Sequence, residues 1–241
     1  MYTGTKPVAE LAERAPRMPT LDVEALALPS VEILTVTYEV RAAVNEAMLP
    51  AGLHPTIPPI VTFVVWRAET FSMAQIRIGC RSGMRPRAFL VSAVVDGGDA
   101  GQQLAERWGF ATRPGTVTLE RSYDRLRATV DDTLDVEVVD PVPLRPSDIQ
   151  WIANMNLAET PRGLRLVQVD ADYEVHRAER GRPRLAAFDA AAWGEPLLEP
   201  VYPVVATFAV ADITLPRLRY VCRPEELAFF ATEPATDAKD A

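Results

Sequence analysis

Lysine is nearly absent from this sequence of 241 residues and occurs only at Lys6 and Lys239, near its two ends. Arginine therefore supplies the positive charge of every segment between them. An arginine stays protonated and cannot form an imine with a carbonyl substrate, whereas a desolvated lysine can. The composition thus argues against a mechanism that proceeds through a Schiff base.

Cysteine and histidine are also scarce, with two residues of each kind. Cys80 and Cys222 lie far apart and belong to no Cys-x-x-Cys pair, so they predict buried thiols and no disulfide framework. His54 and His176 are isolated from other ligand-forming residues, so no metal site is expected. The sequence also lacks the glycine-rich and nucleophile motifs of phosphate-binding and hydrolase sites. No cofactor is therefore expected.

A basic patch and a long apolar run are missing too. The formal net charge is −8, and the arginines are spread singly among acidic residues, as in LERSYDRLRATVDD. Such a surface does not attract a polyanion, so neither a nucleic-acid nor a membrane partner is expected. No apolar stretch approaches the ~20 residues of a membrane helix, and the first residues lack the apolar core of a secretory signal. A cytoplasmic location is expected.

Strand-like segments make up most of what the sequence does contain. The 21 prolines disfavour a helical bundle. Residues 31–38 alternate in the manner of a strand, and three apolar runs of strand length follow, which together predict a sheet buried on both faces. Shorter segments later in the chain predict a meander of strands. The three runs are 60–66, 71–81 and 87–96, and the meander is 115–123, 125–132 and 134–140.

Helices are expected to be few and short, at residues 40–49, 97–109 and 224–231. Residues 163–181 alternate between apolar and polar side chains, which predicts one antiparallel strand with one face in water. A long strand that breaks at Pro216 should follow.

No repeat or linker divides the sequence, so a single domain over residues 1–241 is expected. Residues 1–30 are rich in proline and alanine and are expected to form an N-terminal arm that could pack on a neighbour. Residues 31–230 should form the β-rich core with an internal pocket, and the polar residues 231–241 a disordered tail.

Two blocks of the sequence resemble the acetoacetate decarboxylase family. Between Asp96 and Arg113, a strand-ending aspartate and a helix lead into GFATR, where the family has an aromatic–Pro–Lys–Lys tetrad. ADITLPR, at residues 211–217, looks like the family's C-terminal A-D-I-x-L-P-R strand. The segments TYEVRAAVNEAMLPAGL and PRGLRLVQVDADYEV fit the family in order and spacing. The resemblance therefore covers roughly residues 31–222.

The resemblance implies an α+β fold that is mainly antiparallel β, with a cone-like barrel or sheet, a few short helices and an apolar pocket. It also implies subunits that form a homo-oligomer. In the family, β-keto acids lose CO2 through an imine on the first lysine of the tetrad, and the second lysine lowers the pKa of the first.

This sequence departs from the family at the positions that carry that chemistry. Aligned without gaps from Asp96, Thr112 takes the place of the imine-forming lysine and Arg113 the place of its neighbour. Three further positions that carry charged residues in the family are uncharged here. Two acidic positions correspond to Gln75 and to a site near Val64, and an arginine position corresponds to a site near Val31. A pocket without those groups cannot catalyse the parent reaction.

The resemblance implies a pocket with apolar walls and few polar groups. For Trp66 and Phe110 the core role is favoured over ligand contact, although the two roles overlap at a pocket wall. The wall residues that the resemblance implies are Val64, Trp66, Met73, Trp108 and Phe110.

Three polar residues are candidates for catalysis in that pocket. Arg113 could hold a carboxylate or stabilise an enolate oxygen, or it could simply pair with Glu106 or Glu120 at the surface. Thr112 could donate a hydrogen bond. Gln75 could orient a carbonyl, provided that its side chain points inward.

The sequence therefore suggests an enzyme of the decarboxylase-like family that works without imine chemistry or a cofactor. The expected substrate is an apolar carbonyl, β-keto or polyketide-like small molecule, in a lyase, dehydratase or cyclase step of secondary metabolism. The alternative is a non-catalytic protein that binds a small apolar ligand.

Overall fold

The computed structural model describes residues 2–236, which form one large sheet with four helices and a short 3-10 helix around it. The helical elements are α1 (Val8–Ala12), α2 (Ala42–Met48), α3 (Ala100–Trp108), α4 (Ala228–Ala231) and the 3-10 helix η1 (Pro146–Asp148). The strands are β1 (Leu26–Glu39), β2 (His54–Pro55), β3 (Ile60–Arg67), β4 (Ser72–Ser82), β5 (Arg85–Asp96), β6 (Thr112–Pro114), β7 (Val117–Ser122), β8 (Arg125–Val130), β9 (Leu134–Pro143), β10 (Asn154–Thr160), β11 (Gly163–Val169), β12 (Asp172–Phe188), β13 (Tyr202–Leu215), β14 (Tyr220–Cys222) and β15 (Thr232–Pro234).

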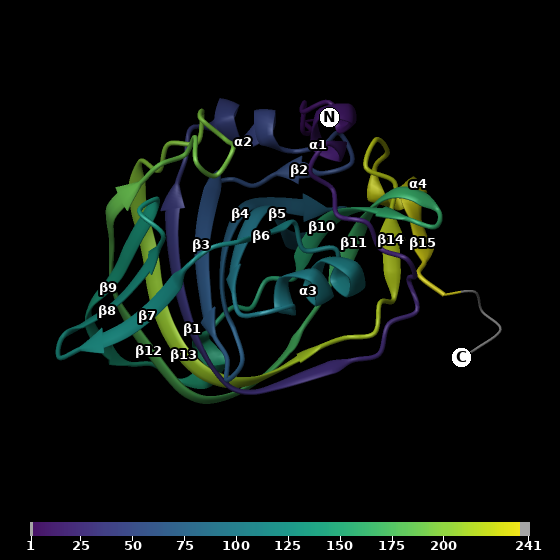
Figure 1. The fold of residues 1–241 in the computed structure, drawn as a ribbon. Helices are drawn as coiled ribbons and strands as arrows, with labels where there is room; N and C mark the ends of the chain where they lie inside the picture. The colour runs from purple at the N-terminus through teal and green to yellow at the C-terminus, as the bar shows by residue number, and fades with distance from the viewer. Residues whose placement is uncertain (1, 237–241) are drawn as a thin grey trace.

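The sheet is mainly antiparallel, which confirms the predicted α+β class. Its hydrogen-bonded order is β15-β14-β11-β10-β5-β4-β3-β1-β13-β12-β9-β8-β7, with β2 beside β4 and β6 beside β5. Only the pairs of β5 with β10 and with β6 are parallel. The order has two free ends, β15 and β7, which Figure 1 shows on opposite sides of the curved sheet. The sheet is therefore open, so of the two expected forms, a cone-like barrel or a sheet, the structure shows the sheet.

Both faces of the central strands are buried, as their nearly continuous apolar sequences predicted. Side chains alternate between the faces along a strand. On β3, Phe63 and Val65 belong to one buried cluster, whereas Val64 and Trp66 belong to another. The chain thus forms two apolar layers separated by the sheet.

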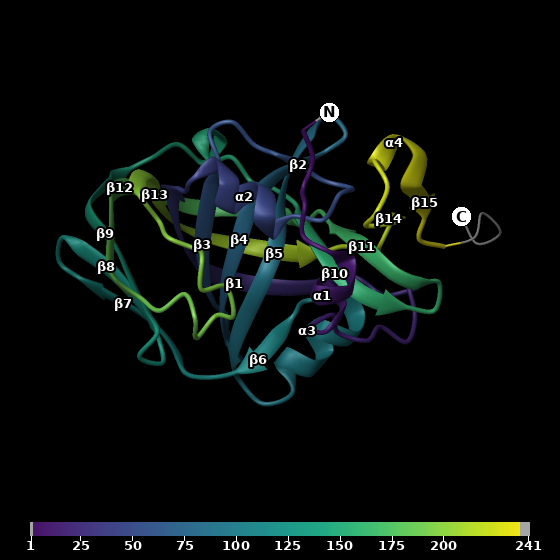
Figure 2. The same ribbon diagram turned by 90° about the horizontal axis from the view of Figure 1, so that it is seen from above.

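The helices lie where the sequence placed them, although they are shorter. Gly109 ends α3 in a left-handed conformation with φ of 68°, which glycine adopts without the steric cost that a side chain would add. In Figure 2, α2 lies across β3 and β4, and α1 lies beside β10. None of the described helices has the length and apolar character of a membrane span.

Three expectations about segments need correction. Residues 163–181 do not form one strand, because the chain leaves the sheet at Asp170 and returns in a distant place: β11 pairs with β10 and β14, while β12 pairs with β13 and β9. Part of the expected disordered tail is ordered, since β15 pairs with β14; residues 237–241 lie outside the described part. The expected arm is shorter than residues 1–30, because β1 already begins at Leu26.

Candidate functional site

A cavity of about 290 Å³ lies against one face of the sheet. Its walls come from strands β1, β3, β4, β5, β12 and β13, and from η1 with the segment 149–152 that follows it. Strand alternation decides which residues face it. On β1, Thr35 and Thr37 line the cavity, whereas Leu34 and Val36 lie in the opposite layer.

The strand register places one charged side chain at this wall. Thr62 on β3 lies directly opposite Arg77 on β4, and both line the cavity. Arg77 is only 9% exposed. Among the described residues no carboxylate forms an ion pair with it, and its Nε atom is buried without a hydrogen-bond partner. Burial lowers the pKa of Arg77 from its ordinary value, but a guanidinium still remains charged at neutral pH.

Two amides hold the Arg77 guanidinium in place. Its Nη1 donates to Oδ1 of Asn154 at 2.7 Å, and Nδ2 of Asn154 donates to Oε1 of Gln75 at 3.0 Å. Gln75 is fully buried, and its Nε2 atom has no hydrogen-bond partner among the described residues. Gln75 is thus directed into the protein but does not line the cavity, and it supports Arg77 there through Asn154.

An aromatic pair forms the wall near Arg77. The rings of Trp151 and Tyr173 stack with centroids 3.9 Å apart and an angle of 6° between their planes. Burial raises the pKa of the Tyr173 hydroxyl to about 12, although the positive charge of Arg77 opposes that rise. Tyr173 is therefore a neutral hydrogen-bond donor at physiological pH.

The apolar wall residues expected from the sequence all lie in one buried cluster. Val64 and Trp66 line the cavity itself. Phe110 and Trp66 line a small adjoining hollow of about 20 Å³. Met73 and Trp108 are packed in the core; the Trp108 indole donates to the carbonyl of Pro216 at 2.8 Å. The structure thus brings these five residues together but places only two of them at the cavity.

Thr112 and Arg113 are not among the residues that line the cavity. The hydroxyl of Thr112 donates to the carbonyl of Gly101 in α3 at 2.9 Å. Arg113 lies at the surface, where its Nη1 is 3.2 Å from Oδ2 of Asp131 and its guanidinium lies 5.4 Å from the ring centroid of Trp193. The reason is local: β6 pairs with the edge of β5, so these side chains point to α3 and to the turn before β9.

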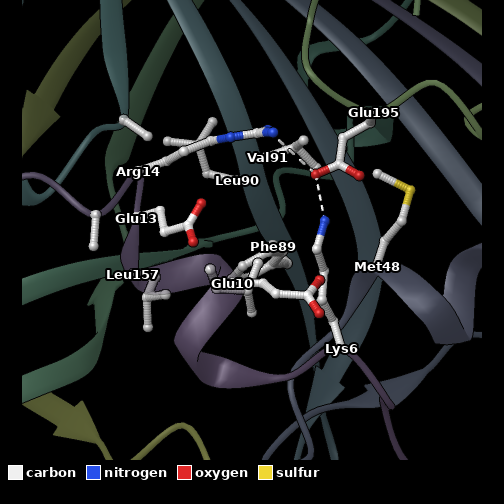
Figure 3. A pocket seen from close by; sticks show the side chains of 13 residues that line it. Lys6, Glu10, Glu13, Arg14, Met48, Phe89, Leu90, Val91, Leu157 and Glu195 are labelled. Atoms are coloured by element: carbon white, nitrogen blue, oxygen red, sulfur yellow. Dashed lines mark hydrogen bonds and ion pairs between the residues drawn. The ribbon is translucent and has the colours of Figure 1, made fainter. Parts of the chain in front are cut away.

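Lys6 lines a separate hollow of about 170 Å³ beneath α1 (Figure 3). Its Nζ lies 2.6 Å from Oε1 of Glu195, and Arg14 approaches the same oxygen at 3.5 Å. Phe89, Val91 and apolar residues from neighbouring elements form the floor of this hollow. No lysine lines the larger cavity among the described residues.

Sequence reasoning missed Arg77, Asn154 and Tyr173. A signal for Arg77 was present, because it is the only charged residue between Ser72 and Cys80 in an otherwise apolar strand. Asn154 and Tyr173 gave no comparable signal, since long-range pairing of the sheet brings Tyr173 to the cavity and Asn154 to the side chain of Arg77.

Comparisons with known proteins agree with this architecture. The family model for acetoacetate decarboxylase matches residues 14–142. A search of curated proteins finds no match. The crystal structure of acetoacetate decarboxylase from Legionella pneumophila has a TM-score of 0.70 and 18% identity, over 85% of this chain and 88% of that chain.

Two further solved structures are similar. The enduracididine biosynthesis enzyme MppR, complexed with pyruvate, has a TM-score of 0.66 and 16% identity, over 90% of this chain and 91% of that chain. An acetoacetate decarboxylase-like enzyme from Sphingomonas wittichii has a TM-score of 0.67 and 16% identity, over 82% of this chain and 93% of that chain. These likenesses show a shared fold. Because the family model covers more than half of the sequence, the chain belongs to the acetoacetate decarboxylase family.

Proposed function

We propose that this chain is an enzyme that binds a small carbonyl carboxylate through Arg77 and acts on it without forming an imine. One observation carries the proposal: the Arg77 guanidinium is buried at the cavity wall without an ion-pair partner in the described part of the chain. An uncompensated buried charge is costly, and a bound anion would remove most of that cost. A carboxylate suits the planar guanidinium because two parallel hydrogen bonds can form.

Two further observations support the proposal that no imine forms and that the ligand is a carbonyl carboxylate. Imine formation needs a lysine at the reacting carbonyl, and the described residues that line the cavity include none. The related enzyme MppR has been crystallised with pyruvate, which is itself a small carbonyl carboxylate. The ligand that we propose for this chain belongs to the same chemical class.

The residues at the cavity suit a reaction that passes through an enolate. Arg77 would neutralise the carboxylate, and the Tyr173 hydroxyl would donate to the oxygen on which negative charge develops. Asp148 is the only carboxylate among the described residues that line the cavity, so we assign it the removal of a proton from the carbon next to the carbonyl. Such an enolate is common to lyase, dehydratase and cyclase steps. A role in secondary metabolism, a homo-oligomeric state and a cytoplasmic location stay predictions.

Binding measurements test the carboxylate site. By calorimetry, pyruvate and acetoacetate should bind the wild-type protein, whereas their methyl esters should not. Arg77→Met should weaken acid binding by about 100-fold, because a buried charge pair loses one partner. Arg77→Lys should rescue it only in part. Equal binding of acids and esters, or acid binding that survives Arg77→Met, would contradict the proposal.

Proton exchange distinguishes catalysis from the alternative of a non-catalytic binding protein. In D2O, the wild-type protein should accelerate deuterium incorporation into the methyl group of pyruvate, as followed by NMR. Asp148→Asn should abolish this exchange while leaving pyruvate affinity within about twofold. Binding without any exchange would favour the binding protein. A covalent adduct away from the chain ends after borohydride treatment would overturn the claim that no imine forms.

A further inference from the structure

We infer that the ligand is a carboxylate whose chain carries additional hydroxyl or carbonyl oxygens, because a band of threonine hydroxyls extends from Arg77 across the cavity wall. The threonine band comprises Thr35, Thr37, Thr62 and Thr207, all of which line the cavity. The inference rests on the proposed function, in which Arg77 binds the carboxylate, and it adds the character of the rest of the ligand.

The strand register makes the band continuous. Thr62 lies opposite Arg77 on one side and opposite Thr37 on the other, across β4, β3 and β1. Thr35 lies opposite Thr207, across β1 and β13. Adjacent strands are about 4.8 Å apart, so the band begins one strand from Arg77 and extends over three strands.

The hydroxyls in the band have unused hydrogen-bonding capacity. The Oγ1 atoms of Thr37 and Thr62 are 3.3 Å apart, and this one contact uses a single proton. Each threonine hydroxyl has one donor proton and two acceptor lone pairs. The hydroxyls of Thr35 and Thr207 have no hydrogen-bond partner within residues 2–236. The band can therefore both donate to and accept from a ligand.

Strand propensity alone does not account for these threonines. Valine has the same branched shape and fits a strand equally well. The opposite face of the same strands is apolar at the neighbouring positions, among them Val36, Phe63 and Phe208. The hydroxyls lie on the face that borders the cavity. Valine at these positions would make better contacts with an apolar ligand.

The extent of the band also sets a minimum length for the ligand. The backbone of Thr37 is two strand spacings, or about 10 Å, from that of Arg77. A three-carbon acid such as pyruvate is too short to reach both Arg77 and the far part of the band. A carboxylic acid of five or more carbons, with oxygens along the chain, can contact both.

Two acids that differ only in oxygenation test the inference by calorimetry. 3,5-Dihydroxyhexanoate should bind the wild-type protein about tenfold more tightly than hexanoate, as expected for one or two additional net hydrogen bonds. The double variant Thr37→Val with Thr62→Val should abolish this preference and leave hexanoate affinity unchanged or improved. Thermal unfolding confirms that the variant is folded.

Thr118→Val with Thr129→Val is the matched control. These two threonines also form a cross-strand pair, with Oγ1 atoms 2.7 Å apart, but on β7 and β8 and away from the cavity. The control should keep the full preference. If both acids bind equally and both depend on Arg77, this inference fails while the proposed function stands. If neither affinity depends on Arg77, both fail.

Discussion

Arginine is used differently in two parts of this sheet. At the end formed by β8, β9 and β12, each buried carboxylate has two arginines: Glu137 has Arg125 at 3.7 Å and Arg184 at 3.3 Å. Glu179 is likewise paired with two arginines, from β7 and β12. At the cavity, Arg77 is more deeply buried than any of these arginines and has no carboxylate in the described chain. The paired arginines are neutralised within the sheet, whereas under the proposed function the charge of Arg77 is available to a ligand.

The largest effect should follow from removing a paired carboxylate. Glu179→Leu leaves Arg121 and Arg177 without their acceptor, so the free energy of unfolding in urea should fall by about 3 kcal/mol. Glu199→Leu is the control, because Glu199 pairs with Arg41 at the exposed surface, and its loss should cost less than about 1 kcal/mol. Similar losses of unfolding free energy in the two variants would show that burial of the ion pair adds nothing to stability.

An intermediate effect is expected from the Tyr173 hydroxyl at high pH. Its folded-state pKa of about 12 lies above the ordinary value of 10.0, so the unfolded chain ionises first. The stabilisation is complete below pH 10 and is lost as the pH rises toward 12, by up to about 2 kcal/mol. Tyr173→Phe should lack this loss when unfolding is measured at pH 8 and pH 11. Equal losses in wild-type and variant proteins would contradict the raised pKa.

The smallest effect should have the opposite sign. Arg77→Met replaces an unpaired buried charge by an apolar side chain of similar length, so the unliganded protein should gain about 1 kcal/mol in the free energy of unfolding. The same variant should lose carboxylate binding. A loss of stability as large as that of Glu179→Leu would remove the contrast between the two regions and make Arg77 a structural residue.

Local patterns in the sequence were sufficient for most of the elements. Alternation identified β1, and runs rich in strand-forming residues identified β3, β4 and β5. The same reasoning joined β11 and β12 into one strand, because alternation continues through the break at Asp170 and cannot show that the two halves pair with different partners. Whether the sheet closes or stays open also depends on pairing between segments that are distant in sequence, and no local sequence pattern indicates that pairing.

The site was predictable only in part, for a similar reason. Apolar residues such as Val64 and Trp66 were found because they follow strand periodicity. Gln75 is buried but does not line the cavity, and Arg113 lies at the surface beside Asp131 instead of Glu106 or Glu120. An ungapped alignment fixes the order of residues along the chain. It does not fix the direction of side chains on β6, which the pairing with β5 determines.

The contact between Lys6 and Glu195 joins residues 189 positions apart. In an unfolded chain, closing a loop of that length would carry a substantial entropic penalty. In the folded protein, backbone hydrogen bonds from Gly4, Thr5 and Lys6 to residues 46–53 already hold this segment in place, so the ion pair adds a contact without having to close that loop. Loss of the ion pair is therefore expected to loosen this segment locally, without global unfolding.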